Sequence, residues 1–173
     1  MKYLIVALKL ERDGSGRMKV LIVYDSVSPM KLTAKIAETI GSALKEKGLE
    51  VDSFIINDAP AVKMSDYGCM IVGGPTMAFK MSKGVSQFLD LLPDKELSGK
   101  FAAAFDTQIQ HRLSGSAAKG IDGRLKKLGL RVIAVPLESY IEGKDDQLRL
   151  KEGEMEKAKN WAQEVAKALQ HEA

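Results

Sequence analysis

The segment VLIVYDSVSPMKLTAKIAETI, residues 20–40, is the most informative part of this sequence. Five apolar or aromatic residues come first, a Ser-Val-Ser-Pro turn follows, and apolar residues then recur at three- and four-residue spacing. The first part is typical of a strand that is buried on both faces, and the last part of an amphipathic helix. A buried strand, a tight turn and a helix form the unit from which parallel α/β sheets are built.

The alternation of strand and helix patterns continues along most of the chain. Continuous apolar runs predict five strands, at residues 20–24, 54–56, 69–72, 101–105 and 132–135. Helical spacing of apolar residues predicts four helices, at residues 32–44, 85–92, 118–128 and 155–169. The region 57–67 fits either a loop or a short helix. This order predicts a doubly wound α/β domain with a parallel sheet and helices on both faces.

The first seventeen residues differ from the rest. MKYLIVAL is followed by the polar, glycine-containing segment KLERDGSGR, and the repeating pattern starts only at a second methionine, Met18. We expect residues 1–17 to be an N-terminal extension, with an extra strand as the alternative, and residues 18–173 to form the domain.

Composition and charge exclude several classes of function. The net charge is +3, of which +2 lies in residues 1–17, and basic tracts mixed with aromatic residues are absent, so nucleic-acid binding is not expected. One cysteine, Cys69, cannot form an internal disulfide, and two histidines add no metal-site spacing. Apolar runs stay far below the roughly 18 residues of a membrane span. A cytoplasmic protein without a metal is expected.

Ligands of doubly wound sheets bind beyond the carboxyl ends of the strands, so the loops after three strands form the candidate site. In the first loop, Ser28 is expected to cap the following helix, with Pro29 at the first helical position. The hydroxyls of Ser26 and Ser28, the charge of Lys31 and backbone amides from Met30 onward suit a phosphate group. A capped helix without any ligand explains the same residues.

The loops after the third and fourth strands carry different side chains. Met77, Phe79 and Met81 place apolar groups in a segment expected to be exposed, where they would contact a ligand, a sheet edge or another subunit. Polar groups in the next loop come from Asp106, Thr107, Gln108, His111 and Arg112. A solvated His111 is the simpler interpretation of that histidine.

Together these segments resemble the flavodoxin family. VLIVYDS…TAKIAETI is similar to its first strand, phosphate loop and first helix, IVGGPTMAF to its third-strand exit, and KFAAAFDT with LSGSAAKGIDGRLKKLG to its fourth strand, second flavin loop and next helix. LKEGEMEKAKNWAQEVAKAL is similar to the closing helix. The resemblance extends from Met18 to about Leu169. It implies a five-stranded parallel sheet of order 2-1-3-4-5 that binds FMN without a covalent bond.

The resemblance also implies a role for particular residues. The phosphate would be held by Ser26, Ser28, Pro29, Met30 and Lys31. The isoalloxazine ring would be flanked by Pro75, Thr76, Met77, Ala78 and Phe79. Its other side and its polar edge would be held by Asp106, Thr107, Gln108, His111 and Ser114. The chain departs from the family pattern at Pro29, where the family has glycine, and in lacking the Trp and Tyr that usually flank the ring.

The expected function is that of an FMN-binding electron carrier, with no catalytic side chain of its own. Two alternatives stay open: an FMN-dependent NAD(P)H or quinone oxidoreductase, and a non-redox module that kept the fold but lost tight FMN binding. The expected partners are a redox protein or a small electron donor or acceptor, and a homodimer is a further expectation.

Overall fold

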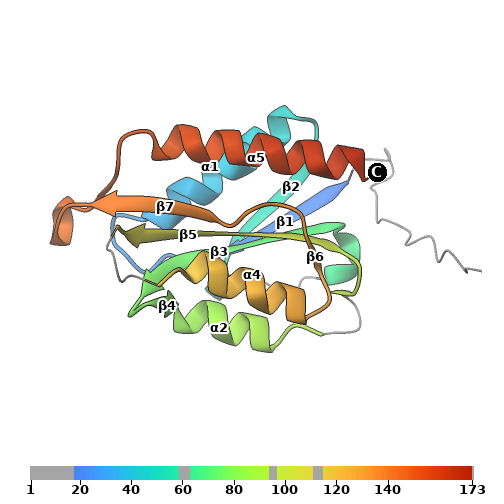
Figure 1. Cartoon of the computed structure of the whole chain (residues 1–173), viewed down its shortest axis with the longest axis horizontal. Helices are drawn as coiled ribbons and strands as arrows, with labels where there is room; N and C mark the ends of the chain where they lie inside the picture. Colours follow the sequence, from blue (N-terminus) through green and yellow to red (C-terminus); the bar gives the residue numbers. More distant parts are fainter. Residues whose placement is uncertain (1–17, 59–62, 94–96, 111–114, 173) are drawn as a thin grey trace, which may run out of the picture.

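The computed structural model describes residues 18–58, 63–93, 97–110 and 115–172. In this part of the chain a mostly parallel sheet lies between two layers of helices (Figure 1). The predicted extension at residues 1–17 lies outside the described residues.

The parallel core of the sheet has the predicted order. Along the sheet the strands are β2 (Glu50–Ile55), β1 (Lys19–Tyr24), β3 (Cys69–Met77), β5 (Phe101–Ile109) and β7 (Leu137–Glu142). Three short strands were not predicted: β4 (Lys80–Met81), β6 (Arg131–Val132) and β8 (Arg149–Leu150). β4 and β8 run antiparallel to β3 and β7, and β6 runs parallel to β5.

Two predicted strands needed correction. The predicted second strand, 54–56, starts too late, because β2 is an edge strand whose first residues alternate between polar and apolar. The predicted fifth strand, 132–135, is split: β6 ends at Val132 and β7 begins at Leu137. The apolar run lies largely in the connection, since Pro136 cannot donate a ladder hydrogen bond.

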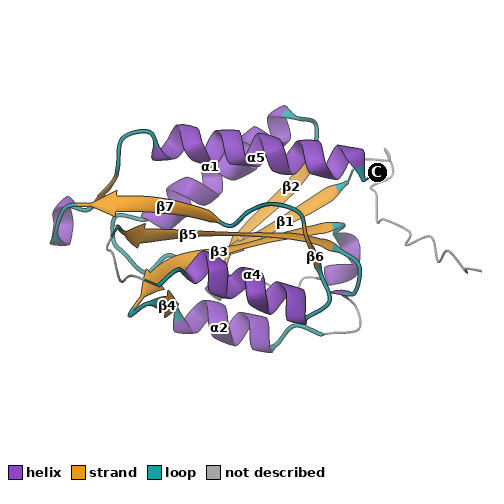
Figure 2. Cartoon of the chain, in the orientation of Figure 1, coloured by secondary structure: helices purple, strands orange, loops and turns teal. Residues whose placement is uncertain are grey.

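The helices fall on the two faces of the sheet (Figure 2). Their bounds are α1 (Leu32–Glu46), α2 (Lys83–Asp90), α4 (Ala117–Lys127) and α5 (Glu154–His171). α1 and α5 cover one face, and α2 and α4 cover the other. Three short 3-10 turns span Ile56–Asp58, Met64–Asp66 and Asp145–Gln147. The first two confirm the short-helix alternative for part of region 57–67.

The sheet has a core on each face because successive strand residues point to opposite sides. In β1, Ile22 packs with α1 and α5, whereas Leu21 packs with α2 and α4, and both are fully buried. This two-sided burial explains why the strand reads as a continuous apolar run.

β3 and β5 run further than predicted. Residues 73–77 and 106–109, expected in loops, continue the ladder, with Gly74 opposite Asp106 and Pro75 opposite Thr107. Proline is tolerated there because β1 ends at Tyr24, opposite Gly73, which leaves Pro75 without a strand on that side. Gly73 makes room for the Phe105 ring, since a β-carbon at Gly73 would lie 2.1 Å from that ring.

The chain reverses direction across the sheet between β1 and β3. From β1 it passes outward to β2, and then returns across β1 to β3. The connections that follow β1 and β3 therefore leave toward opposite faces, and their starts lie side by side at the carboxyl edge. In the described residues, none of the helices is long and apolar enough to span a membrane.

Candidate functional site

The turn between β1 and α1 differs from the prediction. Ser28 does not cap α1: its side-chain Oγ accepts from the Met30 amide at 3.1 Å, and its carbonyl accepts from the Lys31 amide at 2.9 Å. Serine followed by proline also suits the first two positions of a β-turn, and this local signal prevails over the helix-cap signal. α1 therefore begins at Leu32, and Pro29 lies outside the helix.

As a result, α1 has no side-chain cap at its N-terminus. The N-cap residue is Lys31, which is exposed and adopts a left-handed conformation with φ 50°. The amides of the first turn of a helix lack partners within the helix. Ser26, just before the turn, buries its Oγ without a hydrogen-bond partner among the described residues. Uncapped amides and a buried hydroxyl thus lie on the same connection.

Thr33 is a residue of this edge to which the sequence analysis gave no role. It lies in the first turn of α1 and is buried, and its Oγ1 lies 2.7 Å from the Oγ1 of Thr107 in β5. This bond joins the start of α1, which follows β1, to β5, which lies two strands away from β1 in the sheet. The sequence offers no signal for a pairing between residues 74 positions apart.

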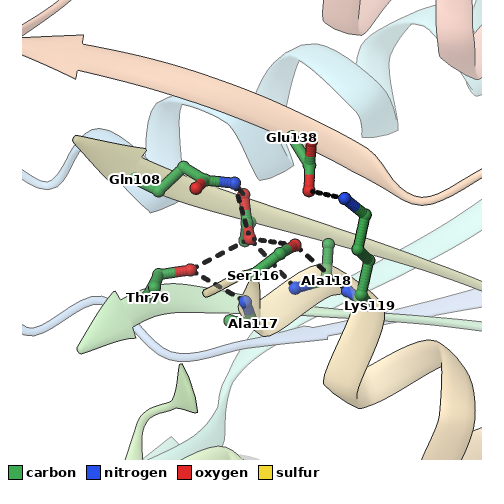
Figure 3. Close-up of polar contacts among 8 residues, drawn as sticks. Thr76, Gln108, Ser116, Ala117, Ala118, Lys119 and Glu138 are labelled. Carbon is green, nitrogen blue, oxygen red and sulfur yellow. Dashed lines mark hydrogen bonds and ion pairs between the residues drawn. The ribbon is translucent and has the colours of Figure 1, made fainter. Parts of the chain in front are cut away.

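The N-terminus of α4 is, by contrast, filled from within the chain (Figure 3). The amide of Ala117 donates to Thr76 Oγ1 at 2.8 Å, that of Ala118 to Asp106 Oδ2 at 3.0 Å, and that of Lys119 to Ser116 Oγ at 3.2 Å. The Asp106 carboxylate takes the place that an anionic ligand would otherwise occupy at this helix.

Asp106 is the centre of this polar network. Besides the Ala118 amide, its carboxylate accepts from Thr76 at 3.0 Å, Ser116 at 3.1 Å and Gln108 at 3.2 and 3.3 Å. The residue is fully buried. Burial raises the pKa of Asp106, and these hydrogen bonds offset part of that rise because they favour the charged form.

A second carboxylate lies on the neighbouring strand. Glu138 of β7, opposite Asp106, forms an ion pair with Lys119 at 3.0 Å. Burial raises the pKa of Glu138, but hydrogen bonds from Lys119, Ser116 and Gln108 outweigh it and leave the pKa below its ordinary value. Ser116, Lys119 and Glu138 were not among the predicted site residues.

The β3–β4 hairpin carries the apolar side chains at this edge. Met77 pairs with Lys80, so Ala78 and Phe79 form a two-residue turn, with φ 45° and 72°. Such positive values suit glycine or asparagine and are strained for a residue such as phenylalanine. Phe79 is 65% exposed and Met77 48% exposed.

Two further exposed apolar residues belong to the same edge. Val27 lies in the β1–α1 turn, and Ile109 is the last residue of β5. Exposed apolar side chains on three adjacent strand ends favour a contact surface for a ligand or a partner.

The predicted site residues therefore divide into three groups. Residues 26–31 and 75–79 meet at the carboxyl edge, where β1 and β3 are neighbours. Asp106, Thr107 and Gln108 reach the same edge, but their side chains are buried and bonded within the protein. His111 and Ser114 lie outside the described residues. The described residues hold no group of three His, Cys, Asp or Glu that could bind a metal.

Comparison with known proteins supports the architecture. Neither a family model nor a curated protein matches the sequence. Among solved structures, flavodoxin 2 from Bacillus cereus has 25% identity and a TM-score of 0.73, over 86% of this chain and 98% of that one. A flavodoxin from the domain Archaea has 22% identity and a TM-score of 0.72, over 89% of this chain and 100% of that one.

Larger proteins contain a similar unit. The flavodiiron protein from Giardia intestinalis has 20% identity and a TM-score of 0.70, over 88% of this chain but only 36% of that one. The fold of this chain therefore occurs both as a complete small protein and as one part of a longer protein.

Proposed function

We propose that this chain, which has the flavodoxin fold, binds FMN at the carboxyl edge of its sheet and transfers electrons between other molecules. When bound, the flavin would supply the redox chemistry, and the protein would bind it, orient it and shield it from water. The electron donor and acceptor would be a redox protein or a small molecule. The lone, buried Cys69 agrees with a cytoplasmic location.

The observation that carries this proposal is the contrast between the two helix N-termini at the edge. Side chains of this chain occupy the first amides of α4, whereas α1 has no side-chain cap. An incoming phosphate would therefore be bound at α1 rather than at α4. Ser26 Oγ, which is buried and unpaired, supplies a further donor, and Lys31 supplies a positive charge.

The residues present also suit a flat aromatic ring. Met77 and Phe79 expose apolar surface next to the β1–α1 turn, and the ring of the flavin would cover that surface. Thr76 bonds both Asp106 and the first amide of α4, so the end of β3 is held against α4. This clamp would keep the hairpin in a constant position when a ligand binds.

The same network favours a carrier over an enzyme with its own acid–base group. Asp106 has a raised pKa, as catalytic carboxylates often do. However, the carboxylate is fully buried and already accepts hydrogen bonds from four residues. A general base needs to reach a proton of the substrate, and this geometry gives Asp106 a structural role instead.

One observation favours the second candidate, a non-redox module. The amides of Met30 and Lys31, expected to bind the phosphate, are used within the turn. The donors available from the turn are therefore fewer than the sequence suggested, and the phosphate would depend on the first turn of α1, Ser26 and Lys31.

An absorbance scan tests the proposal. The purified protein is scanned as isolated, and again after incubation with FMN and removal of unbound flavin. Visible flavin bands that remain with the protein at about one flavin per chain are expected. A protein that stays colourless after this treatment would exclude both redox functions and favour the non-redox module.

A further inference from the structure

A second surface lies along the outer edge of the sheet, between β7 and α5. It is a groove of about 590 Å³. Its lining includes Val135, Tyr140, Lys157, Asn160, Trp161 and Glu164. Val135 is 81% exposed, and Trp161 is the only tryptophan of the chain. Such an exposed apolar residue beside a partly exposed tryptophan is typical of an interaction surface.

The break between β6 and β7 creates this surface. The Trp161 Nε1–H donates to the carbonyl oxygen of Val135 at 2.7 Å. This bond holds the connection against α5 and satisfies the Val135 backbone, while the Val135 side chain remains in solvent. The groove is therefore held in place before any partner binds.

Next to the groove, β7 pairs with another strand on this side over only part of its length. β8 pairs with Ile141 and Glu142, and the Lys151 amide donates to the Tyr140 carbonyl. From Leu137 to Ser139, β7 has no strand partner on this side among the described residues, but Leu137 and Ser139 are buried, so other parts of the chain cover the backbone there. The groove therefore offers a partner side chains rather than a strand edge.

The α5 side of the groove carries a charge pattern that is complementary to itself. Lys157, Trp161 and Glu164 follow at helical spacing and line one groove, with the tryptophan between opposite charges. Lys157 is held by Glu154 at 2.5 Å and lies 4.6 Å from the centre of the Tyr140 ring. Glu164 is exposed and has no ion-pair partner among the described residues.

We propose that this groove binds a second copy of the chain in a twofold dimer. If two copies of α5 lie antiparallel, Lys157 of each protomer faces Glu164 of the other, and the two tryptophans meet near the axis. Because the charges of α5 pair with those of a second, antiparallel α5, the groove favours a second copy of the chain over an unrelated partner.

Charge reversal gives a sharp test, because the two single variants complement each other. In a homodimer of Lys157→Glu, or of Glu164→Lys, both contacts join like charges. In the mixed pair, both contacts join opposite charges. Sedimentation equilibrium of the full chain should show dimer dissociation constants at least about tenfold higher for each variant alone. An equimolar mixture should return to within about threefold of the unchanged protein.

Apolar contact is tested with a matched pair of variants. Val135→Lys should weaken the dimer, whereas Leu91→Lys should not, although Leu91 at the end of α2 is equally exposed, at 83%. Trp161 fluorescence gives a second readout, because its emission should change with protein concentration in the unchanged protein. An unchanged protein that remains monomeric at all concentrations, or variants that do not recover on mixing, would overturn the proposal.

Discussion

At the carboxyl edge, residues with the local pattern of a helix cap adopt a different structure. Ser28 and Pro29 fit a helix cap in sequence, but they form a turn, and Lys31 becomes the N-cap residue in a left-handed conformation. The charge of Lys31 therefore lies at the first turn of α1, where a phosphate would be bound.

We predict that Lys31→Ala weakens FMN binding about tenfold, as loss of a hydrogen bond between charged groups does. Riboflavin, which lacks the phosphate, should bind equally well to both proteins. Lys35→Ala, an exposed lysine one turn later in α1, serves as the control. The measurement is isothermal titration of each variant with both flavins, and an equal loss for FMN and riboflavin would contradict the assignment.

A second residue-scale prediction concerns Asp106. Its pKa is raised in the folded protein, so the folded state binds a proton at a higher pH than the unfolded state does. The contribution of Asp106 to the free energy of unfolding should therefore decrease as pH rises from the ordinary aspartate pKa through the raised value, and be constant above it.

Denaturant titrations of the unchanged protein and of Asp106→Asn over a series of pH values measure this effect. The difference between the two proteins isolates Asp106 from Asp52 and Glu138, whose pKa values are lowered and which act in the opposite direction. A difference that is the same at every pH would show that Asp106 does not have a raised pKa.

At the scale of elements, the β3–β4 hairpin combines strain with exposure. Its turn residues have positive φ without being glycine, and the Phe79 carbonyl lies against Gly115, where a β-carbon would come within 1.8 Å of it. Strained backbone and exposed apolar side chains often occur together at binding sites. Gly115, just before α4, leaves room for the Phe79 carbonyl, and the Ala117 amide of α4 donates to Thr76 in β3, so the start of α4 and the segment before it pack against the hairpin.

We predict that Ala78→Gly raises the free energy of unfolding by about 0.5–1 kcal/mol, because glycine adopts positive φ without steric cost. Ala168→Gly in the last turn of α5 is the control and should lower it by about 0.5–1 kcal/mol. Chemical denaturation followed by circular dichroism measures both. Destabilisation by both substitutions would show that the turn is not strained.

At the scale of the whole molecule, the proposed site links three adjacent strands and the first turn of α1. A ligand bound there contacts the folded protein only, so its binding free energy adds to the stability of the entire domain. This coupling makes thermal unfolding a test of the cofactor that does not depend on electron transfer.

We predict that FMN at about a hundredfold its dissociation constant adds about 2.7 kcal/mol to the free energy of unfolding. For a domain of this size that corresponds to a Tm increase of roughly 5–10 °C. Riboflavin at the same concentration should raise the Tm less, since it lacks the phosphate. Calorimetric scans with each flavin provide the comparison, and an unchanged Tm with FMN would argue against the site.

The sequence pattern by itself determined the class of the fold, whereas the order of the strands was implied by the resemblance to the flavodoxin family. Continuous apolar runs and helical stripes depend on residues near one another in the chain. This is why β1 and the helices α1, α2, α4 and α5 were predicted close to their observed bounds, and β3 and β5 from the residue at which each begins. The described parts of the candidate segments lie at one edge, as expected, because all carboxyl ends of parallel strands point the same way.

Only the tertiary structure decided which polar groups at that edge remain available for a ligand. The Asp106 carboxylate accepts from an amide of α4, the Thr107 hydroxyl bonds Thr33, and Ser28 accepts within its own turn. By contrast, the Ser26 hydroxyl has no partner among the described residues, and the start of α1 has no side-chain cap. Most of these pairings join residues far apart in the chain, so no local pattern encodes them. The split fifth strand is different, because Pro136, which cannot donate a ladder hydrogen bond, is a signal within the sequence, and only the bond from Trp161 that holds the Val135 connection comes from α5.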